Sequence, residues 1–220
     1  MRRNGRCLAG RASFIVTLLA IAGAVGASPT SAAGHTPFDT NLVKNPGAEA
    51  GAGTDGNHTV LIPNWVTGGS AFTVVRYGAA GFPTKGESAR IHGGSKFFSC
   101  GQDTVSDAGS QTIALNGRTT LIANGHVKVK LSARIAGYDS QLDEGLVLLL
   151  FYQDGQEIGS IQTGAVSASD SLFVLKRASG VVPPGTNSMK VELYGQSDTS
   201  NGGTYCDAYF DNISVVLKLV

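Results

Sequence analysis

The stretch Val127-Lys128-Val129-Lys130-Leu131-Ser132-Ala133-Arg134-Ile135 alternates apolar with polar residues along its whole length. Successive side chains of a β-strand point to opposite faces of a sheet, so this period of two predicts a strand with one face buried and the other in water. The same alternation recurs at residues 189–194 and 213–219. Helical periodicity is almost absent after residue 33, and the sequence therefore predicts an all-β fold.

A continuous apolar stretch at residues 146–153 is followed by Asp154-Gly155 and by a second stretch at residues 156–162. We expect a β-hairpin here, because Asp-Gly is favoured in tight turns whose two central residues need a positive φ. Further strands are expected at residues 71–77, 89–92, 96–99, 110–115 and 172–177. Short strands separated by turns rich in Gly, Asn, Ser and Asp indicate one antiparallel β-sandwich of about 8–10 strands.

The first 33 residues have the features of an export signal. They begin with four basic residues and no acidic one: Arg2, Arg3, Arg6 and Arg11. The apolar run at residues 14–27 is shorter than the ~20 residues of a spanning helix and is followed by the small residues Ser31-Ala32-Ala33. We expect a signal peptide at residues 1–33, cleaved after Ala33 or, as a second choice, after Ala27; an uncleaved anchor is the alternative. Residues 34–220 would then be a secreted, extracellular single domain.

Cleavage would change the charge of the chain. It removes four of the 17 Lys and Arg residues and no acidic residue, leaving 13 against 16 Asp and Glu, a formal net charge of −3. A mildly acidic domain with scattered cations lacks the basic patch that nucleic acids require. No polybasic run favours a membrane surface, and no later segment is long enough to span a membrane. We therefore expect no nucleic-acid partner and no membrane span in the mature chain.

Two cysteines, Cys100 and Cys206, remain after cleavage. In an exported chain an even pair favours a disulfide bond, with two free thiols as the alternative. A bond between them would close a loop of about 100 residues and would stabilise the fold by about 4–5 kcal/mol in the chain-entropy model.

Both ends of the mature chain carry family motifs. The segment Asn41-Leu42-Val43-Lys44-Asn45-Pro46-Gly47-Ala48-Glu49 resembles the N-L-V-x-N-P-G-F-E opening of jelly-roll carbohydrate-binding modules, with Ala48 where the family often has Phe, and Pro63-Asn64-Trp65 follows it. The closing Ala208-Tyr209-Phe210-Asp211-Asn212-Ile213-Ser214-Val215 is similar to the last strand of the same galactose-binding-like superfamily. The resemblance implies a jelly roll of two antiparallel sheets with adjacent chain ends.

The resemblance also implies a structural Ca²⁺ near those ends. Transferred to this sequence, Glu49 and Asp211 would supply carboxylates, and backbone carbonyls near Asn45 and Asp211 would complete the shell. Calcium prefers six to eight oxygen ligands and accepts carbonyls, so this donor set is chemically reasonable. The alternative is that both carboxylates only bind backbone N–H groups of loops.

Tyrosines at strand–loop junctions are the candidates for ligand contact, because sugar-binding sites combine flat aromatic rings with polar neighbours. Tyr138 and Tyr205 occupy such junctions, and Asp139 and Gln141 follow Tyr138 closely. These four residues are the predicted ligand-binding set. Trp65, the only tryptophan, is expected to pack in the core or at its edge, with contact to a sugar as the alternative.

The residues that could carry catalysis do not match the spacing of a known catalytic motif. Asp139, Asp143 and Glu144 cluster in one loop without the spacing of an EF-hand, so we interpret them as a solvated loop, with a second Ca²⁺ site or the rim of a ligand groove as alternatives. Residues 92–95, His-Gly-Gly-Ser, are followed by no nucleophile elbow.

The leading hypothesis is a non-catalytic, lectin-like module that binds a glycan or polysaccharide. The runner-up is a cell-envelope structural domain that binds an envelope protein, and a small glycan hydrolase is the third hypothesis.

Overall fold

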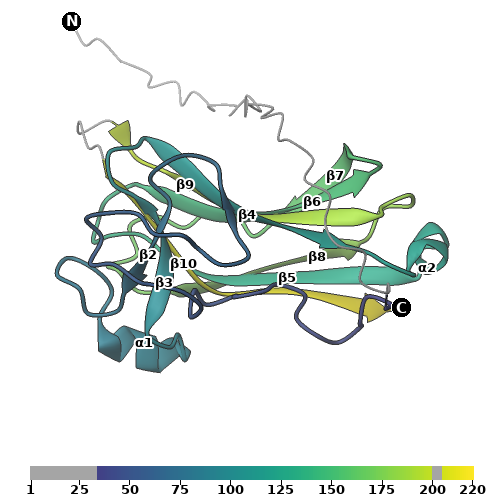
Figure 1. Cartoon of the computed structure of the whole chain (residues 1–220), viewed down its shortest axis with the longest axis horizontal. Helices are drawn as coiled ribbons and strands as arrows, with labels where there is room; N and C mark the ends of the chain where they lie inside the picture. The colour runs from purple at the N-terminus through teal and green to yellow at the C-terminus, as the bar shows by residue number, and fades with distance from the viewer. Residues whose placement is uncertain (1–33, 200–204) are drawn as a thin grey trace, which may run out of the picture. The chain divides into compact units, whose positions relative to one another are not determined.

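The described residues, 34–199 and 205–220, form two five-stranded antiparallel sheets that stack face to face (Figure 1). Their structure is a computed structural model, in which the described residues make up one compact unit. The predicted antiparallel β-sandwich is confirmed. The expected signal peptide at residues 1–33 lies outside the described residues. Within the described ranges, no helix has the length and apolarity that crossing a membrane requires.

The first sheet has the strand order β2-β3-β10-β5-β8 and the second has the order β1-β4-β9-β6-β7. The strands of the first sheet are β2 (Thr73–Arg76), β3 (Lys96–Gly101), β10 (Cys206–Leu219), β5 (Val127–Ala136) and β8 (Val174–Val181). Those of the second sheet are β1 (Val66–Thr67), β4 (Ser106–Ala114), β9 (Ser188–Gln196), β6 (Glu144–Gln153) and β7 (Gln156–Gln162). Two short helices complete the described chain: α1 (Lys85–Ile91) and α2 (Thr119–Ala123). Figure 1 shows α1 beside β2 and β3 at one end of the sandwich, and α2 at the other end.

The main core lies between the sheets, as the alternating pattern predicts. The apolar positions of β5 are buried, whereas Lys128 and Lys130 between them are exposed. Trp65 is buried in this core, where its ring centroid lies 5.0 Å from that of Phe98 and its Nε1 donates to the carbonyl of Asn45 at 3.2 Å. The predicted hairpin is also present, since β6 and β7 pair across Asp154 and Gly155, which have φ values of 50° and 85°.

A second, smaller core covers the outer face of the first sheet. It contains Val75, Tyr77, Ile91, Phe97, Ala136, Phe173 and Tyr209. Along β10, Cys206, Ala208 and Phe210 therefore pack in the main core, whereas Tyr209 packs in the second one. Helix α1 contributes Ile91 to this outer core, so this face of β10 is covered rather than open to water.

The strand predicted at residues 89–92 is wrong, because these residues end α1 and its cap. The hydroxyl of Thr84 accepts the N–H of Glu87 at 3.1 Å, which satisfies a donor that the first helical turn leaves free. His92 closes the helix in the left-handed region, with a φ of 56°. Residues 84–87 carry the Thr-x-x-Glu signature of a helix start, which favours this helix over a strand.

The opening motif lies against the last strand, as the family resemblance implies. The amide of Asn41 donates to the carbonyl of Ile213 at 2.8 Å, and its oxygen accepts the N–H of Val215 at 3.0 Å. The N–H of Ile213 donates in turn to the carbonyl of Pro46 at 2.9 Å. These bonds bring Glu49 and Asp211 to the same end of the first sheet.

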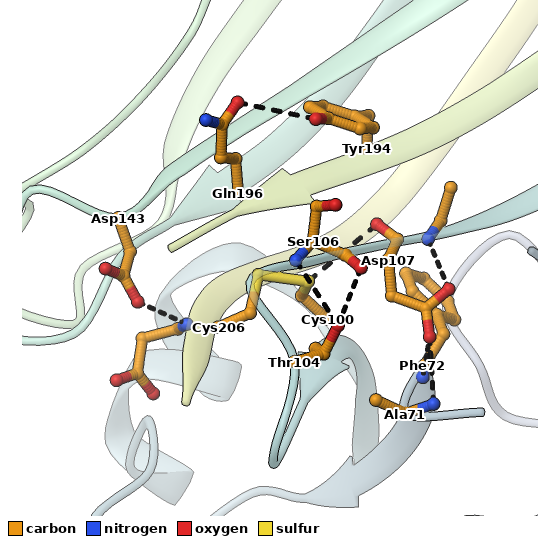
Figure 2. Close-up of a disulfide and its surroundings, with 12 residues drawn as sticks. Ala71, Phe72, Cys100, Thr104, Ser106, Asp107, Asp143, Tyr194, Gln196 and Cys206 are labelled. Atoms are coloured by element: carbon orange, nitrogen blue, oxygen red, sulfur yellow. Dashed lines mark hydrogen bonds between the residues drawn. A yellow bond between two sulfur atoms is a disulfide. The ribbon is translucent and has the colours of Figure 1, made fainter. Parts of the chain in front are cut away.

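The predicted disulfide joins Cys100 at the end of β3 to Cys206 at the start of β10 (Figure 2). Their Cα atoms lie 5.3 Å apart, and both residues are fully buried. The bond fixes the first residue of β10 against the neighbouring strand, and this residue directly precedes Asp207.

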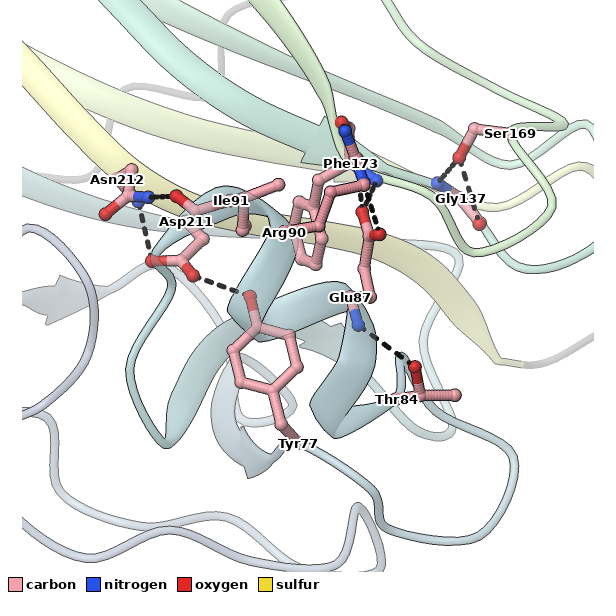
Figure 3. Close-up of polar contacts among 10 residues, drawn as sticks. All are labelled: Tyr77, Thr84, Glu87, Arg90, Ile91, Gly137, Ser169, Phe173, Asp211 and Asn212. Atoms are coloured by element: carbon pink, nitrogen blue, oxygen red, sulfur yellow. Dashed lines mark hydrogen bonds and ion pairs between the residues drawn. The ribbon is translucent and has the colours of Figure 1, made fainter.

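Helix α1 is held to the segment before β8 by a buried carboxylate. Glu87 Oε1 accepts the N–H of Phe173 at 2.6 Å, and Arg90 contacts both oxygens at 2.6 and 2.7 Å (Figure 3). Burial opposes ionisation of Glu87, but the bonds from Arg90 and Phe173 outweigh it and hold the pKa of Glu87 below its ordinary value of 4.5. The helix is therefore fixed by charge-assisted hydrogen bonds as well as by Ile91.

The substitution Glu87→Gln should lower the free energy of unfolding at pH 7 by about 1.5–3 kcal/mol, the value of a hydrogen bond to a charged group. Because the pKa of Glu87 is lowered in the folded chain, its contribution is present above pH 4.5 and is lost as the pH falls through the folded-state pKa. Urea unfolding at several pH values measures this loss. The difference in the free energy of unfolding between the wild type and Glu87→Gln should disappear below pH 4.5. The exposed Glu157 gives a control, since Glu157→Gln should change stability by less than about 0.5 kcal/mol. A gap independent of pH would contradict the ionic role.

Candidate functional site

A hollow of about 210 Å³ opens at the end of the sandwich where three segments meet. It is lined by Gly81, Phe82, Tyr138, Tyr205 and Asp207. The first two belong to the connection between β2 and α1, Tyr138 follows β5, and the last two lie at the start of β10. We call this the loop-end hollow.

Aromatic rings that are themselves packed build its wall. The ring of Phe82 lies 6.1 Å from that of Tyr205 and 5.7 Å from that of Tyr209. The hydroxyl of Tyr205 donates to the carbonyl of Gly56 at 3.2 Å, and a β-carbon at Gly56 would collide with the ring of Phe82. Burial and the nearby charge of Asp207 raise the pKa of Tyr205 to about 12, so its phenol stays protonated at neutral pH. The wall is therefore a fixed apolar surface with a hydroxyl at its edge.

Asp207 is the acidic group of the hollow. Its Oδ1 accepts the hydroxyl of Tyr209 at 2.5 Å, and its own N–H donates to Asp143. Burial raises the pKa of Asp207 to about 6, the bond from Tyr209 opposes this, and the charge of Asp143 adds to it. The carboxylate is thus ionised for the most part at pH 7 and can accept hydrogen bonds, while it gains a proton near pH 6.

Asp143 supports the hollow from behind. It is buried, and its Oδ1 and Oδ2 accept the N–H groups of Asp198 and Asp207, both at 2.7 Å. It therefore connects the loop before β6 to the end of β9 and to the start of β10. The interpretation of residues 139–144 as a solvated acidic loop is wrong for Asp143, although Asp139 and Glu144 are exposed.

The structure brings together two of the four residues predicted to bind ligand. Tyr138 and Tyr205 line the same hollow, whereas Asp139 and Gln141 do not. The last two are exposed, and their carbonyls accept N–H groups from Asp170 and Ala168 at 3.0 and 2.9 Å. Sequence reasoning missed Phe82 and Asp207. The sequence does contain a signal for Asp207. It lies between Cys206 and Ala208, which face the main core, so its side chain must point to the opposite face of β10.

The two residues predicted to bind calcium lie beside the second core. Asp211 is fully buried, and its oxygens accept the hydroxyl of Tyr77 and the N–H of Asn212, each at 2.6 Å (Figure 3). Burial raises the pKa of Asp211 to about 8, against the effect of these two bonds, and the charge of Glu49 contributes to the increase. An ionised Asp211 is therefore unfavourable at neutral pH unless further positive charge is present.

Glu49 is bound by the residues that open β3. Its Oε1 accepts the N–H groups of Ser95 and Lys96 at 2.9 Å, and its Oε2 accepts the hydroxyl of Ser95 at 2.7 Å. Both carboxylates lie against consecutive glycines. A β-carbon at Gly94 would lie 2.7 Å from Oε1 of Glu49, and one at Gly93 would collide with Oδ2 of Asp211.

The carboxylate and carbonyl oxygens at this place are the kind of ligand that calcium prefers. No group of three or more His, Cys, Asp or Glu side chains converges as a metal site among residues 34–199 and 205–220. Calcium, however, binds two carboxylates together with backbone carbonyls. Each carboxylate offers about four lone-pair positions, and the bonds above use two on Asp211 and three on Glu49. The carbonyl of Asn45, the other expected ligand, accepts Trp65 Nε1.

Neither a scan against models of protein families nor a search of curated proteins finds a match to this sequence. Among solved structures, the chain is similar to the Stig cyclase Fisc from Fischerella sp. TAU, solved with (3Z)-3-(1-methyl-2-pyrrolidinylidene)-3H-indole. The TM-score is 0.57 at 14% identity, over 82% of this chain and 98% of the cyclase. It is also similar to the enzymatically active domain of bacteriophage CBA120 tailspike protein 4, with a TM-score of 0.52 at 16% identity, over 81% of this chain. This chain spans only 21% of the tailspike domain.

Carbohydrate-binding modules are also among the similar structures. The CBM22-1 xylan-binding domain from Paenibacillus barcinonensis Xyn10C aligns with a TM-score of 0.43 at 14% identity, over 76% of this chain and 93% of that domain. At such low identity, what this chain shares with the cyclase and the tailspike domain is the jelly-roll fold.

The substitution Asp143→Asn should lower the free energy of unfolding by about 1–3 kcal/mol, because the amide nitrogen would face a backbone N–H that then lacks an acceptor. Denaturant unfolding measures this change. Asp139→Asn, in the same loop but exposed, should change stability by less than about 0.5 kcal/mol. Equal effects of the two substitutions would contradict the supporting role of Asp143.

Proposed function

We propose that this protein is a secreted, non-catalytic, lectin-like module that binds a glycan in the loop-end hollow. The observation that carries the proposal is the combination in that hollow of packed aromatic rings with one buried carboxylate. Apolar ring faces stack on the C–H surface of a sugar, and a carboxylate with phenolic hydroxyls accepts and donates bonds to sugar hydroxyls.

The size of the hollow limits the ligand. Its volume of about 210 Å³ is below the ~300–1,000 Å³ of sites that enclose a drug-sized molecule. We therefore expect it to hold a single sugar unit, at a chain end or on a branch, rather than a long stretch of polysaccharide.

The carboxylates favour binding over hydrolysis. Most glycoside hydrolases use two carboxyl groups that flank the scissile bond. Of the described residues that line the hollow, Asp207 alone carries a carboxylate, and both oxygens of the neighbouring Asp143 accept backbone N–H groups. A hydrolase in this hollow would therefore lack its second acid among these residues.

A glycan array probed with the mature chain, with and without Ca²⁺, tests the proposal, and titration calorimetry then measures the affinity. Tyr205→Ala should weaken binding about tenfold, the equivalent of about 1.4 kcal/mol for a lost stacking contact and its hydroxyl. Asp207→Asn should weaken it further for glycans that donate hydroxyls to the carboxylate.

Tyr194→Ala is the matched control, since Tyr194 is a half-buried tyrosine on β9 in the other sheet. Its affinity should equal that of the wild type. A loss in Tyr194→Ala with none in Tyr205→Ala would move the site to that sheet. Absence of binding to any glycan, together with capture of one envelope protein, would favour the alternative of a protein-interaction domain.

We further propose that Glu49 and Asp211 hold a structural Ca²⁺. The support is the buried carboxylate with its raised pKa, the second carboxylate beside it and the glycines that leave room against both. The ion would supply the positive charge that the buried carboxylate of Asp211 requires beside the exposed carboxylate of Glu49, and would connect the opening motif to the last strand.

Calcium at 100 times its Kd should raise the melting temperature by about 5–10 °C, because such binding contributes about 2.7 kcal/mol and each kcal/mol shifts a domain of this size by about 2–4 °C. Calorimetry with Ca²⁺ and with a chelator measures the shift. It should disappear in Glu49→Gln and persist in Glu144→Gln, which changes an exposed carboxylate. A chelator that leaves the melting temperature of the wild type unchanged would refute the ion.

A further inference from the structure

A second hollow, larger than the loop-end hollow, also borders the connection between β2 and α1. It has a volume of about 580 Å³ and is lined by Arg76, Tyr77, Lys85, Ser88, Ala89, His92, Gly94 and Ser95. We call it the basic groove. Neither the loop-end hollow nor the calcium proposal uses its charged residues.

Helix α1 forms one wall of the groove with a single face. Lys85, Ser88, Ala89 and His92 are spaced by three and four residues, so they lie along one side of the helix. Glu87 and Ile91 point to other sides, where they hold the helix to Phe173 and to the second core. These contacts fix the rotation of α1 about its axis, so the face with Lys85 and His92 is the one that lines the groove.

The opposite wall comes from the two strands beside the helix. Arg76 ends β2 and Tyr77 follows it, and Gly94 and Ser95 precede β3. Tyr77 is buried, and its hydroxyl is held by Asp211 (Figure 3), so its ring forms a fixed part of the groove. Both walls are thus attached to the sandwich.

The groove carries positive charge in a domain that is acidic after export. The eight residues that line it include one arginine, one lysine and one histidine but no carboxylate. Lys85 and His92 are exposed, and their side chains form no hydrogen bond or ion pair with any residue in the described ranges. Arg76 donates through one nitrogen to Asp55 at 3.2 Å, and its other guanidinium donors remain available.

The carboxylates nearest the groove are already engaged. Glu87 pairs with Arg90 on another side of α1, Glu49 accepts three donors behind Ser95, and Asp211 accepts Tyr77 beneath the groove. Asp55, the partner of Arg76, is 71% exposed, so its ion pair with Arg76 is a weak surface contact that a ligand can displace.

The hydroxyl groups of the groove act as acceptors. The hydroxyl of Ser88 donates to the carbonyl of Gly94 at 2.5 Å, and that of Ser95 donates to Glu49 at 2.7 Å. Each therefore has lone pairs left but no free proton. A ligand that matches the groove needs an anionic group for Arg76 and Lys85, together with hydroxyl donors for the two serines.

We propose that the basic groove binds an acidic glycan through a carboxylate or sulfate group held between Arg76 and Lys85. Sugars of this class carry both an anion and several hydroxyls on one ring. The choice of a glycan rests on the proposed function, whereas the anion preference rests on the groove itself. The volume is more than twice that of the loop-end hollow, so a ligand longer than one sugar unit fits.

Calorimetric titration of the mature chain with matched probes tests this proposal. The probes are oligogalacturonate and its methyl ester, dextran sulfate and dextran, and inorganic sulfate. The acidic member of at least one pair should bind at least tenfold more tightly than its neutral partner. The double variant Arg76→Gln/Lys85→Gln should remove that preference and leave binding of neutral glycans unchanged.

Lys128→Gln/Lys130→Gln is the matched control, because it removes two exposed charges from β5, outside the groove. It should keep the preference, which would exclude an effect of net charge. An equal loss in the two double variants, or equal affinity for acidic and neutral partners, would overturn the groove and leave the proposed function standing. Inorganic sulfate that competes as strongly as dextran sulfate would overturn the glycan as its ligand.

The two proposals can fail separately. Acidic binding that survives Tyr205→Ala, together with no binding of any neutral glycan, would support the groove and refute glycan binding in the loop-end hollow. Acidic binding lost in Tyr205→Ala but kept in Arg76→Gln/Lys85→Gln would place the anion in the loop-end hollow and overturn the groove.

Discussion

Burial of acidic side chains on the outer face of β10 is the constraint that organises this end of the molecule. Asp207 and Asp211 alternate with Tyr209 along the strand, and helix α1 and its flanking loops cover that face. A buried carboxylate is costly unless donors surround it. Each of the two accepts a tyrosine hydroxyl, from Tyr209 and Tyr77 respectively. The tyrosines of the second core therefore fill that core with their rings and also donate hydrogen bonds to the buried carboxylates beside it.

The same requirement explains why loops here are fixed rather than loose. Asp107 accepts the N–H groups of Gly69, Ala71, Phe72 and Ala108 at 2.7–2.9 Å. Asp143 and Glu49 act alike on the segments that flank β10 and β3. Backbone N–H groups in loops lack the carbonyl acceptors that a neighbouring strand provides in a sheet. Each of these carboxylates accepts their hydrogen bonds instead. The disulfide adds a covalent restraint at Cys206, so the start of β10 and the aromatic wall beside it are held from two directions.

The sequence predicts the sheets well because period-two alternation is a local signal. It finds β5, β9 and β10, and Asp154-Gly155 gives the hairpin of β6 and β7. It misses α1, because seven residues span only two turns and show little periodicity. The cap at Thr84 was the available local signal.

The candidate site is harder to predict, because its residues meet only through the fold. Phe82, Tyr138 and Tyr205 come from three separate segments, and only their positions at strand–loop junctions pointed to the last two. Proximity in sequence misleads here. Asp139 and Gln141 follow Tyr138 but lie in a turn, with a φ of 45° at Asp139, whose backbone bonds to residues 168–170. The surroundings of Asp207 depend on Asp143, which is distant in the sequence, so they cannot be predicted from the residues near Asp207.

The connection between β2 and α1 gives the two hollows a common wall. Tyr77 and Lys85 at its ends face the basic groove, and Gly81 and Phe82 within it face the loop-end hollow. Its backbone bonds, from Gly78 to Pro83 and from Phe82 to Ala79, keep it a single stiff turn. A substitution inside it would alter both hollows, whereas Tyr205 and Arg76 each belong to one of them. Because Glu87 sets the rotation of α1, its hydrogen bonds to Phe173 and Arg90 also decide which helix face the groove receives. Stability at that buried carboxylate and recognition in the groove thus depend on the same short helix.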